Sequence, residues 1–337
     1  AFATDPTRGF FILSFLAIVV IGALILYAWR APSLDSNVGF SFLSRETFLL
    51  LNNVLLVIAT ILILLGTLAP LIFEIFDGGK ISIGAPWFEV AFLVPMIPLI
   101  LLLGLGMHTA WRKQNSRPWI KLLKQPAMTA VIIGILLPLM FYGRSSLLLV
   151  IGCGSAAWIV LSSLIQPIRS LLRAEGVASI TRSALGMSIA HLGVGLFVIG
   201  VTITSAFGVE TDRAMRIGET SEVAGLQFEF RGLRDIQGPN YVAIEGILEI
   251  RDKGEFIGTV RPQKRQYLVQ KDLMTEASIY PTWNKDLFVA LGEQIGEDTW
   301  SIRIQYKPMI RFIWIGAFIM AIGGLISITD RRYRKVA

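Results

Sequence analysis

The sequence predicts a membrane protein made of about seven apolar helices, with a β-rich domain inserted before the last helix. Hydrophobic residues make up 54% of the 337 positions, charged residues make up only 16%, and the mean hydropathy is +0.64. Apolar runs of about 20 residues, the length that crosses a bilayer as a helix, recur along the chain. A segment of about 100 residues near the C-terminal end instead alternates apolar and polar residues, as half-buried strands do.

These patterns divide the chain into three parts. Residues 1–208 are expected to form a transmembrane bundle of six helices, residues 209–308 a β-rich domain, and residues 309–337 a final transmembrane helix with a basic tail. The connecting segments 111–126 and 166–182 are rich in lysine and arginine and are expected to lie outside the spans. The expected spans are residues 10–29, 48–73, 90–107, 127–142, 147–165, 183–208 and 309–328.

The distribution of basic residues predicts the orientation of the bundle. The segments on one side contain 14 lysines and arginines, whereas the short loops on the other side contain only Arg8, Lys80 and Arg144. Because basic segments stay in the cytoplasm, residues 209–308 are expected to lie outside. The net charge of +7 therefore reflects orientation signals and not a nucleic-acid surface. The cytoplasmic set is Arg30, Arg45, Arg112, Lys113, Arg117, Lys121, Lys124, Arg169, Arg173, Arg182, Arg331, Arg332, Arg334 and Lys335.

Residues 209–308 are expected to form a compact antiparallel β domain. Apolar and polar residues alternate at 226–230, 247–250 and 300–306, and turn signals at 238–240 and 253–254 separate these runs. The segment contains no histidine or cysteine, which argues against the usual transition-metal clusters. It also contains no recognisable nucleophile–base pair, so its expected role is to dock partners.

The sixth span contains one ionisable side chain, His191, and it is the strongest candidate for a functional group. Intramembrane ionisable residues are costly and are usually functional. Gly186, Gly193 and Gly200 recur every seven residues on a neighbouring face. The pattern fits a haem ligand with room for a porphyrin, but glycines at this spacing more often pack helices closely, and a lone membrane histidine can simply hydrogen-bond a neighbouring helix. His108, the other histidine, ends the third span and is assigned to the membrane interface.

The single cysteine limits what chemistry this chain can carry out on itself. Cys153 lies in an apolar span and cannot form an intrachain disulfide. The CxxCH motif for covalent haem attachment is absent, so any thioether would form on another polypeptide. The residues of the sequence do not identify a catalytic group.

Longer strings carry a family resemblance along the whole chain. The membrane part contains SRETFLLLNNVLL at 44–56, LGTLAP at 65–70, ISIGAPWF at 81–88 and YKPMIRFIWIG at 306–316. The β-rich part contains GPNY at 238–241, QKRQY at 263–267, MTEASI at 274–279 and DLFVALGE at 286–293. Together with AFATDPTRG at 1–9 and the closing RRYRK, these strings resemble the C-terminal half of the CcmF family, the haem lyase subunits of cytochrome c maturation.

The resemblance implies an activity, a cofactor and partners. Members of the family attach haem covalently to the CxxCH thiols of apocytochrome c, outside the bacterial inner (plasma) membrane. The fold would then be an all-α polytopic membrane bundle with an inserted periplasmic β-rich domain. Two membrane histidines of the family ligate haem b, and the second matches His191, the expected axial ligand of the haem iron. The implied partners are the haem chaperone CcmE, CcmH-type subunits, apocytochrome c, quinol as an electron donor, and membrane lipid.

The sequence also departs from the family pattern. The tryptophan-rich WWD segment, both external histidines and the first membrane ligand histidine have no counterpart here. The chain is therefore expected to hold part of a haem lyase site and to need the missing N-terminal CcmF half. A non-catalytic scaffold that recruits maturation partners through the β domain is an alternative. A small-molecule permease is a further one, although the spans contain few charge pairs or paired helix breaks.

Overall fold

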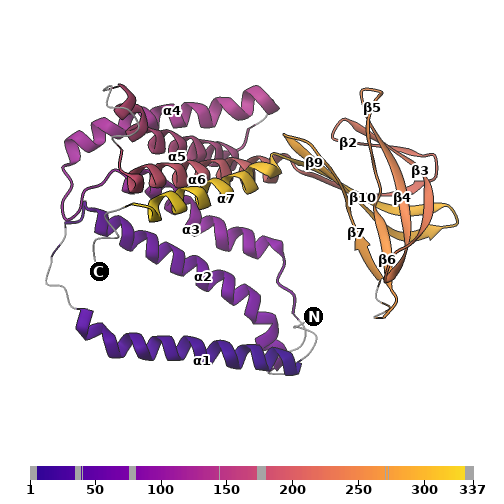
Figure 1. Cartoon of the computed structure of the whole chain (residues 1–337), viewed down its shortest axis with the longest axis horizontal. Helices are drawn as coiled ribbons and strands as arrows, with labels where there is room; N and C mark the ends of the chain where they lie inside the picture. The colour runs from indigo at the N-terminus through magenta and orange to yellow at the C-terminus, as the bar shows by residue number, and fades with distance from the viewer. Residues whose placement is uncertain are drawn as a thin grey trace. The chain divides into compact units, whose positions relative to one another are not determined.

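A computed structural model places the predicted elements in space (Figure 1). It describes residues 6–34, 39, 41–75, 81–143, 145–172, 180–269, 271 and 273–330. Seven of its helices are long and apolar enough to cross a membrane. They are α1 (Pro6–Arg30), α2 (Arg45–Ile75), α3 (Ala85–Gly106), α4 (Ser116–Tyr142), α5 (Leu147–Leu172), α6 (Arg182–Phe207) and α7 (Ile310–Ile328), and a short 3-10 helix, η1 (Ala31–Leu34), follows α1.

Ten strands lie between α6 and α7 and form two antiparallel sheets. One sheet has the order β1-β10-β9-β8, and the other has the order β2-β3-β4-β6-β7 with β5 also paired to β4. The strands are β1 (Val209–Arg216), β2 (Thr220–Val223), β3 (Leu226–Gln237), β4 (Tyr241–Asp252), β5 (Glu255–Val260), β6 (Gln263–Tyr267), β7 (Leu273–Glu276), β8 (Ser278–Pro281), β9 (Lys285–Gly296) and β10 (Thr299–Pro308). The predicted fold class, a polytopic helical bundle with an inserted β-rich domain, is confirmed.

The alternation of the sequence forms the strands because one face of each strand packs into a common core. Phe228 and Phe230 of β3, Ile250 of β4, and Ile302 and Ile304 of β10 are completely buried, and in β3 and β10 the buried residues alternate with more exposed ones. The three alternating runs of the sequence all lie in strands. The predicted turn at Lys253 and Gly254 joins β4 to β5. Their φ values are 50° and 89°, the left-handed conformation that glycine adopts readily.

The helices exceed the expected spans at two basic segments. Helix α4 begins at Ser116 and so includes Lys121 and Lys124, and α5 continues to Leu172 through Arg169. Long lysine and arginine side chains are good helix formers and reach water from a helix end, so the helix continues past the apolar run. Lys80, Arg144, Arg173, Arg331, Arg332, Arg334 and Lys335 of the predicted charge pattern lie outside the described residues.

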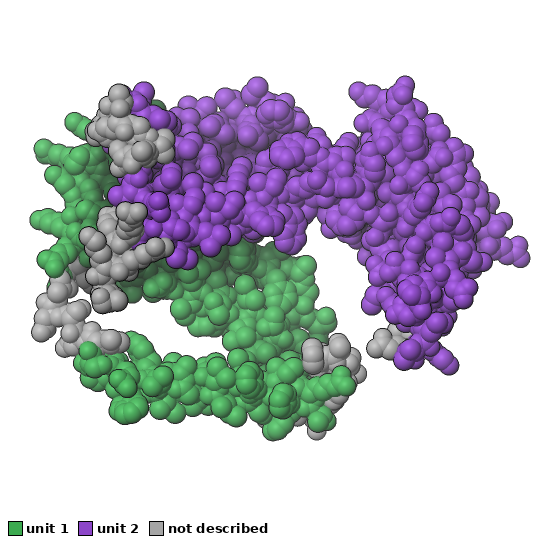
Figure 2. Space-filling model, viewed as in Figure 1, with its two compact units in different colours: residues 1–128 green, residues 129–337 purple. Residues whose placement is uncertain are grey.

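The chain divides into two compact units, residues 1–128 and 129–337, and the division falls within α4 (Figure 2). In the second unit the β domain is joined directly to the helices at both ends. Gly208 alone separates α6 from β1, and Met309 alone separates β10 from α7. The Thr204 hydroxyl of α6 donates to the Pro308 carbonyl of β10 at 2.7 Å, so the two connections are held side by side.

Candidate functional site

Helix α6 is positioned at its N-terminus by two capping side chains. The Thr181 hydroxyl accepts from the Ala184 N–H at 3.3 Å, the usual N-cap arrangement. The carboxylate of Asp330, just beyond α7, accepts from the Ser183 N–H at 2.8 Å. Asp330 is buried and lies 147 residues away in sequence, so the N-cap signal at Thr181 is visible in the sequence and the contribution of Asp330 is not. These bonds fix the register of α6 against the end of α7.

His191 is half-buried in the third turn of α6, and a hydrogen bond within the helix orients its ring. Its Nδ1 lies 2.8 Å from the Met187 carbonyl oxygen, one turn earlier. Because a carbonyl oxygen only accepts, Nδ1 donates, and in the neutral form of the ring the lone pair is then on Nε2. Histidines that bind metals usually donate their other ring N–H to a carbonyl or carboxylate in this way. In its neutral form the ring therefore has the tautomer that an Nε2 metal ligand requires.

The heptad glycines of α6 pack against α7. A Cβ atom built on Gly193 would lie 2.6 Å from the Gly316 carbonyl oxygen, and one built on Gly316 would lie 2.6 Å from the Gly193 carbonyl oxygen. Gly186 meets Gly323 in the same way, at 2.5 Å from its carbonyl oxygen, and Gly200 meets the backbone of Ile313. These distances leave no space for a side chain. Close helix packing therefore explains the glycines, and they do not provide room for a porphyrin.

The face of α6 that carries His191 is directed elsewhere. Gly195 and Thr202 follow His191 at i+4 and i+11, and residues with this spacing share one helix face. A Cβ on Gly195 would lie 2.5 Å from Val160 Cγ2, and Thr202 closely contacts Gly152, so this face packs along α5. His191 is thus set apart from the α7 contact. Buried serines also line these two helices: Ser155, Ser162 and Ser163 of α5 and Ser188 of α6.

The partner glycines on α7 were not predicted, although the sequence contains their signal. Gly316 and Gly323 are seven residues apart in the last span, which matches the spacing of Gly186 and Gly193. Two helices with the same glycine repeat can bring their backbones together over several turns. The shared repeat could have paired the sixth span with the seventh.

The other sequence candidates fall outside this arrangement. His108 lies in the turn after α3, where its backbone N–H donates to the Leu105 carbonyl oxygen at 3.3 Å, and its assignment to the membrane interface stays a prediction. Cys153 is buried in the core formed by α5 and α6 with Ile203 and Phe207. Within the described ranges, no group of three or more histidine, cysteine, aspartate or glutamate side chains is arranged to hold a metal ion.

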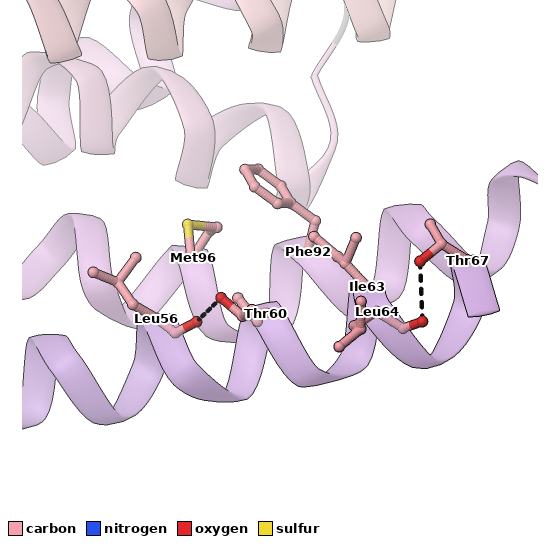
Figure 3. Close-up of a pocket in the computed structure, with 8 residues that line it drawn as sticks. Leu56, Thr60, Ile63, Leu64, Thr67, Phe92 and Met96 are labelled. Carbon is pink, nitrogen blue, oxygen red and sulfur yellow. Dashed lines mark hydrogen bonds between the residues drawn. The ribbon is translucent and has the colours of Figure 1, made fainter. Parts of the chain in front are cut away.

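An apolar groove of about 390 Å³ runs between α2 and α3 (Figure 3). Two threonines line it, but each hydroxyl donates to its own helix: Thr60 to the Leu56 carbonyl at 2.8 Å and Thr67 to the Leu64 carbonyl at 3.0 Å. The groove suits an apolar chain and presents no charged group among its lining residues. Those residues are Leu56, Ala59, Thr60, Ile63, Leu64, Thr67, Phe92 and Met96.

The β domain pairs its charged side chains with one another. Arg303 donates two hydrogen bonds to Asp212, at 2.8 and 2.9 Å, and these bonds lower the pKa of the Asp212 carboxyl. The hydrogen bond from Arg231 likewise lowers the pKa of Glu249. Buried Glu245 accepts from both Arg234 and Gln263 at 2.7 Å. Such networks satisfy the charges and stabilise the surface, and they do not resemble a catalytic pair.

Known proteins resemble this chain both in its β domain and along nearly its whole length. The family model described as "CcmF C-terminal beta-sandwich" covers residues 206–308. The CcmF protein of Pseudomonas aeruginosa is 40% identical over 337 residues, which cover 99% of this chain and 51% of that protein. The CcmF protein of Escherichia coli (strain K12) is 36% identical over 335 residues, again with 99% and 51% coverage. The chain spans about half the length of the curated relatives it matches.

A solved structure shares the fold. It is named "Cytochrome c Heme Lyase CcmF", and it matches with a TM-score of 0.68 and 22% sequence identity over 86% of this chain and 46% of that one. At this identity the match concerns the fold alone. The sequence relatives and the β-sandwich model add the family resemblance, and together they show that the chain is similar to the C-terminal half of the CcmF cytochrome c-type biogenesis proteins.

Proposed function

We propose that this chain forms part of the membrane haem lyase of cytochrome c maturation. In this role it helps to attach haem covalently to the CxxCH thiols of apocytochrome c. It also contributes His191 as an axial ligand of a resident haem b. The family match supports the pathway, and the orientation of His191 is the single observation that supports its place in the site.

The donor chemistry of α6 fits a haem ligand. Imidazole is a common axial ligand of haem iron, and the bond from Nδ1 to the Met187 carbonyl holds the ring so that Nε2 has the lone pair. Beyond Arg182 at its start, α6 carries no ionisable side chain other than His191, which gives a low-dielectric environment in which axial ligation would strongly influence the redox potential. A bound haem b would supply one-electron transfer, here to the iron of the substrate haem, with quinol as the electron donor.

A haem b held by His191 would need a second ligand from another part of the protein. The two proposed haem faces cannot both be ligated from α6, because its helical residues include one histidine. His108 lies in the other compact unit, at the end of α3, and we do not assign it to the haem. We assign the opposite ligand to the half of the CcmF proteins that this chain does not match.

The β domain is assigned to partner binding. Its apolar core is complete and its described acidic and basic side chains form extensive ion pairs, so it is a stable platform without an evident catalytic group. The partners proposed for it are the haem chaperone CcmE, CcmH-type subunits and apocytochrome c. The distribution of basic residues supports a multi-pass chain in the bacterial inner membrane with residues 209–308 in the periplasm.

The decisive experiment substitutes His191 in the complete protein, made with both CcmF halves. His191→Ala should lower the absorbance of haem b and the yield of matured cytochrome c together. His191→Gly should recover part of the absorbance when imidazole is added, because the small side chain leaves space for the free ligand. His108→Ala is the matched control and should leave both readings nearly unchanged.

The outcomes separate the proposal from its alternative. Full haem b absorbance in His191→Ala with a loss in His108→Ala would reverse the ligand assignment. Normal maturation by a protein with no bound haem b would favour the non-catalytic scaffold, which recruits maturation partners through the β domain. A protein level equal to wild type, measured by immunoblotting, ensures that the comparison concerns ligation and not folding.

A further inference from the structure

The turn between β8 and β9 is fixed against the first turn of α7. The Trp283 ring lies 5.8 Å from the Phe312 ring at an interplanar angle of 62°, an edge-to-face contact. The backbone N–H of Met309 donates to the Asn284 carbonyl oxygen at 2.7 Å. Arg311 forms an ion pair with Asp286 at 3.0 Å. Three contacts of different kinds therefore hold this turn beside the start of a membrane-spanning helix.

Trp283 remains exposed although the turn that carries it is well ordered by hydrogen bonds. Its exposed fraction is 69%, and the Thr282 hydroxyl bridges the turn by donating to the Lys285 carbonyl oxygen at 2.5 Å. The Trp283 side chain therefore lies at the surface of the β domain and not in its core. An indole, which has an apolar body and one N–H donor, is most stable at a membrane–water interface. Its contact with Phe312 places it at the depth where α7 begins.

Basic side chains surround the same turn. Lys285 begins β9 and Lys307 lies opposite Asp286 in the next strand, with its Nζ 4.6 Å from the Phe288 ring. Lys285 Nζ lies 5.9 Å from the Tyr306 ring. Lys285 and Lys307 lie on opposite faces of the β9–β10 pair, and Arg311 is paired with Asp286. The nearest acidic residue on β1, Glu210, is paired with Arg303 at 3.4 Å.

An exposed tryptophan with a local excess of positive charge, next to the end of an apolar helix, matches an anionic membrane surface. We propose that the β8–β9 turn is a membrane anchor, in which Trp283 lies at headgroup level and Lys285 and Lys307 contact the phosphates of anionic phospholipids. The bilayer, already required by α7, extends directly to this turn, and the charge is complementary to its headgroups. The anchor would restrict the angle of the β domain to the membrane. It does not depend on the haem function proposed above.

The test places an environment-sensitive fluorophore beside Trp283 without removing it. In a Cys153→Ala background, Asn284→Cys is labelled with a nitrobenzoxadiazole dye and the full chain is placed in phosphatidylcholine nanodiscs, with or without phosphatidylglycerol. Ile295→Cys is the matched control, because Ile295 is also exposed but lies at the other end of β9, on the order of 30 Å along the strand. The measurements are the emission maximum and quenching by lipids brominated on their acyl chains.

The label at position 284 should emit at shorter wavelength than the label at position 295 and should be quenched several-fold more by the brominated lipids. Phosphatidylglycerol should increase both effects. Trp283→Ala should shift the emission at position 284 to longer wavelength, and Lys285→Gln with Lys307→Gln should remove the phosphatidylglycerol dependence. An unchanged signal at position 295 shows that each variant has kept the β fold.

Two results would overturn the proposal. Equal emission and equal quenching at positions 284 and 295 would mean that the turn faces water. A response at position 284 that is the same with and without phosphatidylglycerol would eliminate the role of Lys285 and Lys307 in headgroup binding, and with it the anionic surface as the partner.

Discussion

Helices α6 and α7 and the β domain are adjacent in the chain, but they bury opposite kinds of residues. Between the helices the contact is made by small residues: Gly186, Gly193 and Gly200 meet the backbone of α7, while Phe318 of α7 is 70% exposed. In the β domain the contact is made by large residues, and the side chains of Phe228 and Phe230 are fully buried. The two regions are therefore assembled by different forces.

The difference follows from the solvent around each region. Water drives large apolar side chains into the core of the β domain, at about 25 cal/mol for each Å² removed from water. Lipid tails are as apolar as leucine, so a buried leucine in a membrane gains little, and helices associate through close van der Waals contact of their backbones. The size of the residues at a packing contact therefore indicates whether the region folds in water or in the hydrocarbon of a membrane.

The largest expected effect is a cavity in the water-driven core. Residues 209–308 expressed alone are expected to fold, because Phe228 packs in a core supplied entirely by this segment. Phe228→Ala should then lower the free energy of unfolding by about 3–5 kcal/mol. Urea titration followed by circular dichroism measures the change. Phe256→Ala is the control, since Phe256 is 56% exposed, and it should cost far less. A random-coil spectrum for the unsubstituted segment would show that the core needs the helices.

A smaller effect is expected when the helix contact is enlarged by one methyl group. Gly193→Ala places a Cβ 2.6 Å from the Gly316 carbonyl oxygen, so the helices must separate, at a cost of about 1–3 kcal/mol. Thermal unfolding of the purified chain in detergent measures the loss. Gly324→Ala, on α7 with no atom within 4 Å of the added Cβ, should be neutral or slightly stabilising because alanine favours helix. Equal losses for the two substitutions would refute backbone packing as the cause.

The smallest effect concerns a surface ion pair of the β domain and its dependence on pH. The hydrogen bonds from Arg303 lower the pKa of Asp212 in the folded state. A lowered folded-state pKa contributes stability above the ordinary aspartate pKa, and this contribution is lost as the pH falls through the folded-state value. The melting temperature of residues 209–308 should therefore fall less on acidification in Asp212→Asn than in wild type. An identical acid dependence in both proteins would show that solvent screens the pair completely.

The elements of the fold were largely predictable, because each follows from a local period in the sequence. The alternation at 226–230 marked β3, and the turn residues Lys253 and Gly254 marked the β4–β5 connection. The helix ends were less accurate at α4 and α5, where an apolar criterion stopped at lysine and arginine residues that continue the helix. Hydropathy records where a helix is apolar, whereas backbone hydrogen bonds decide where it ends.

The candidate site was predictable only in part. His191 was identifiable because an ionisable residue in an apolar span is rare, and its role as a haem ligand stays a prediction. The interpretation of the neighbouring glycines as space for a porphyrin is not supported, since the backbone of α7 occupies that space. A glycine specifies only that a side chain is missing, and the sequence does not say what comes close to it.

By itself the sequence determined the spans, the β-rich segment and the one imidazole of α6, because periodicity and residue type act locally. Only the tertiary structure decided which face of α6 meets α7, that the Met187 carbonyl orients His191, and that Asp330 caps a helix 147 residues away. The α6–α7 contact and the Asp330 cap depend on the approach of segments that are distant along the chain, whereas the Met187–His191 bond depends on the side-chain rotamer within one helix. The glycine repeat shared by the sixth and seventh spans indicates that they pair, but the backbone distances and the capping bond form only when the helices pack.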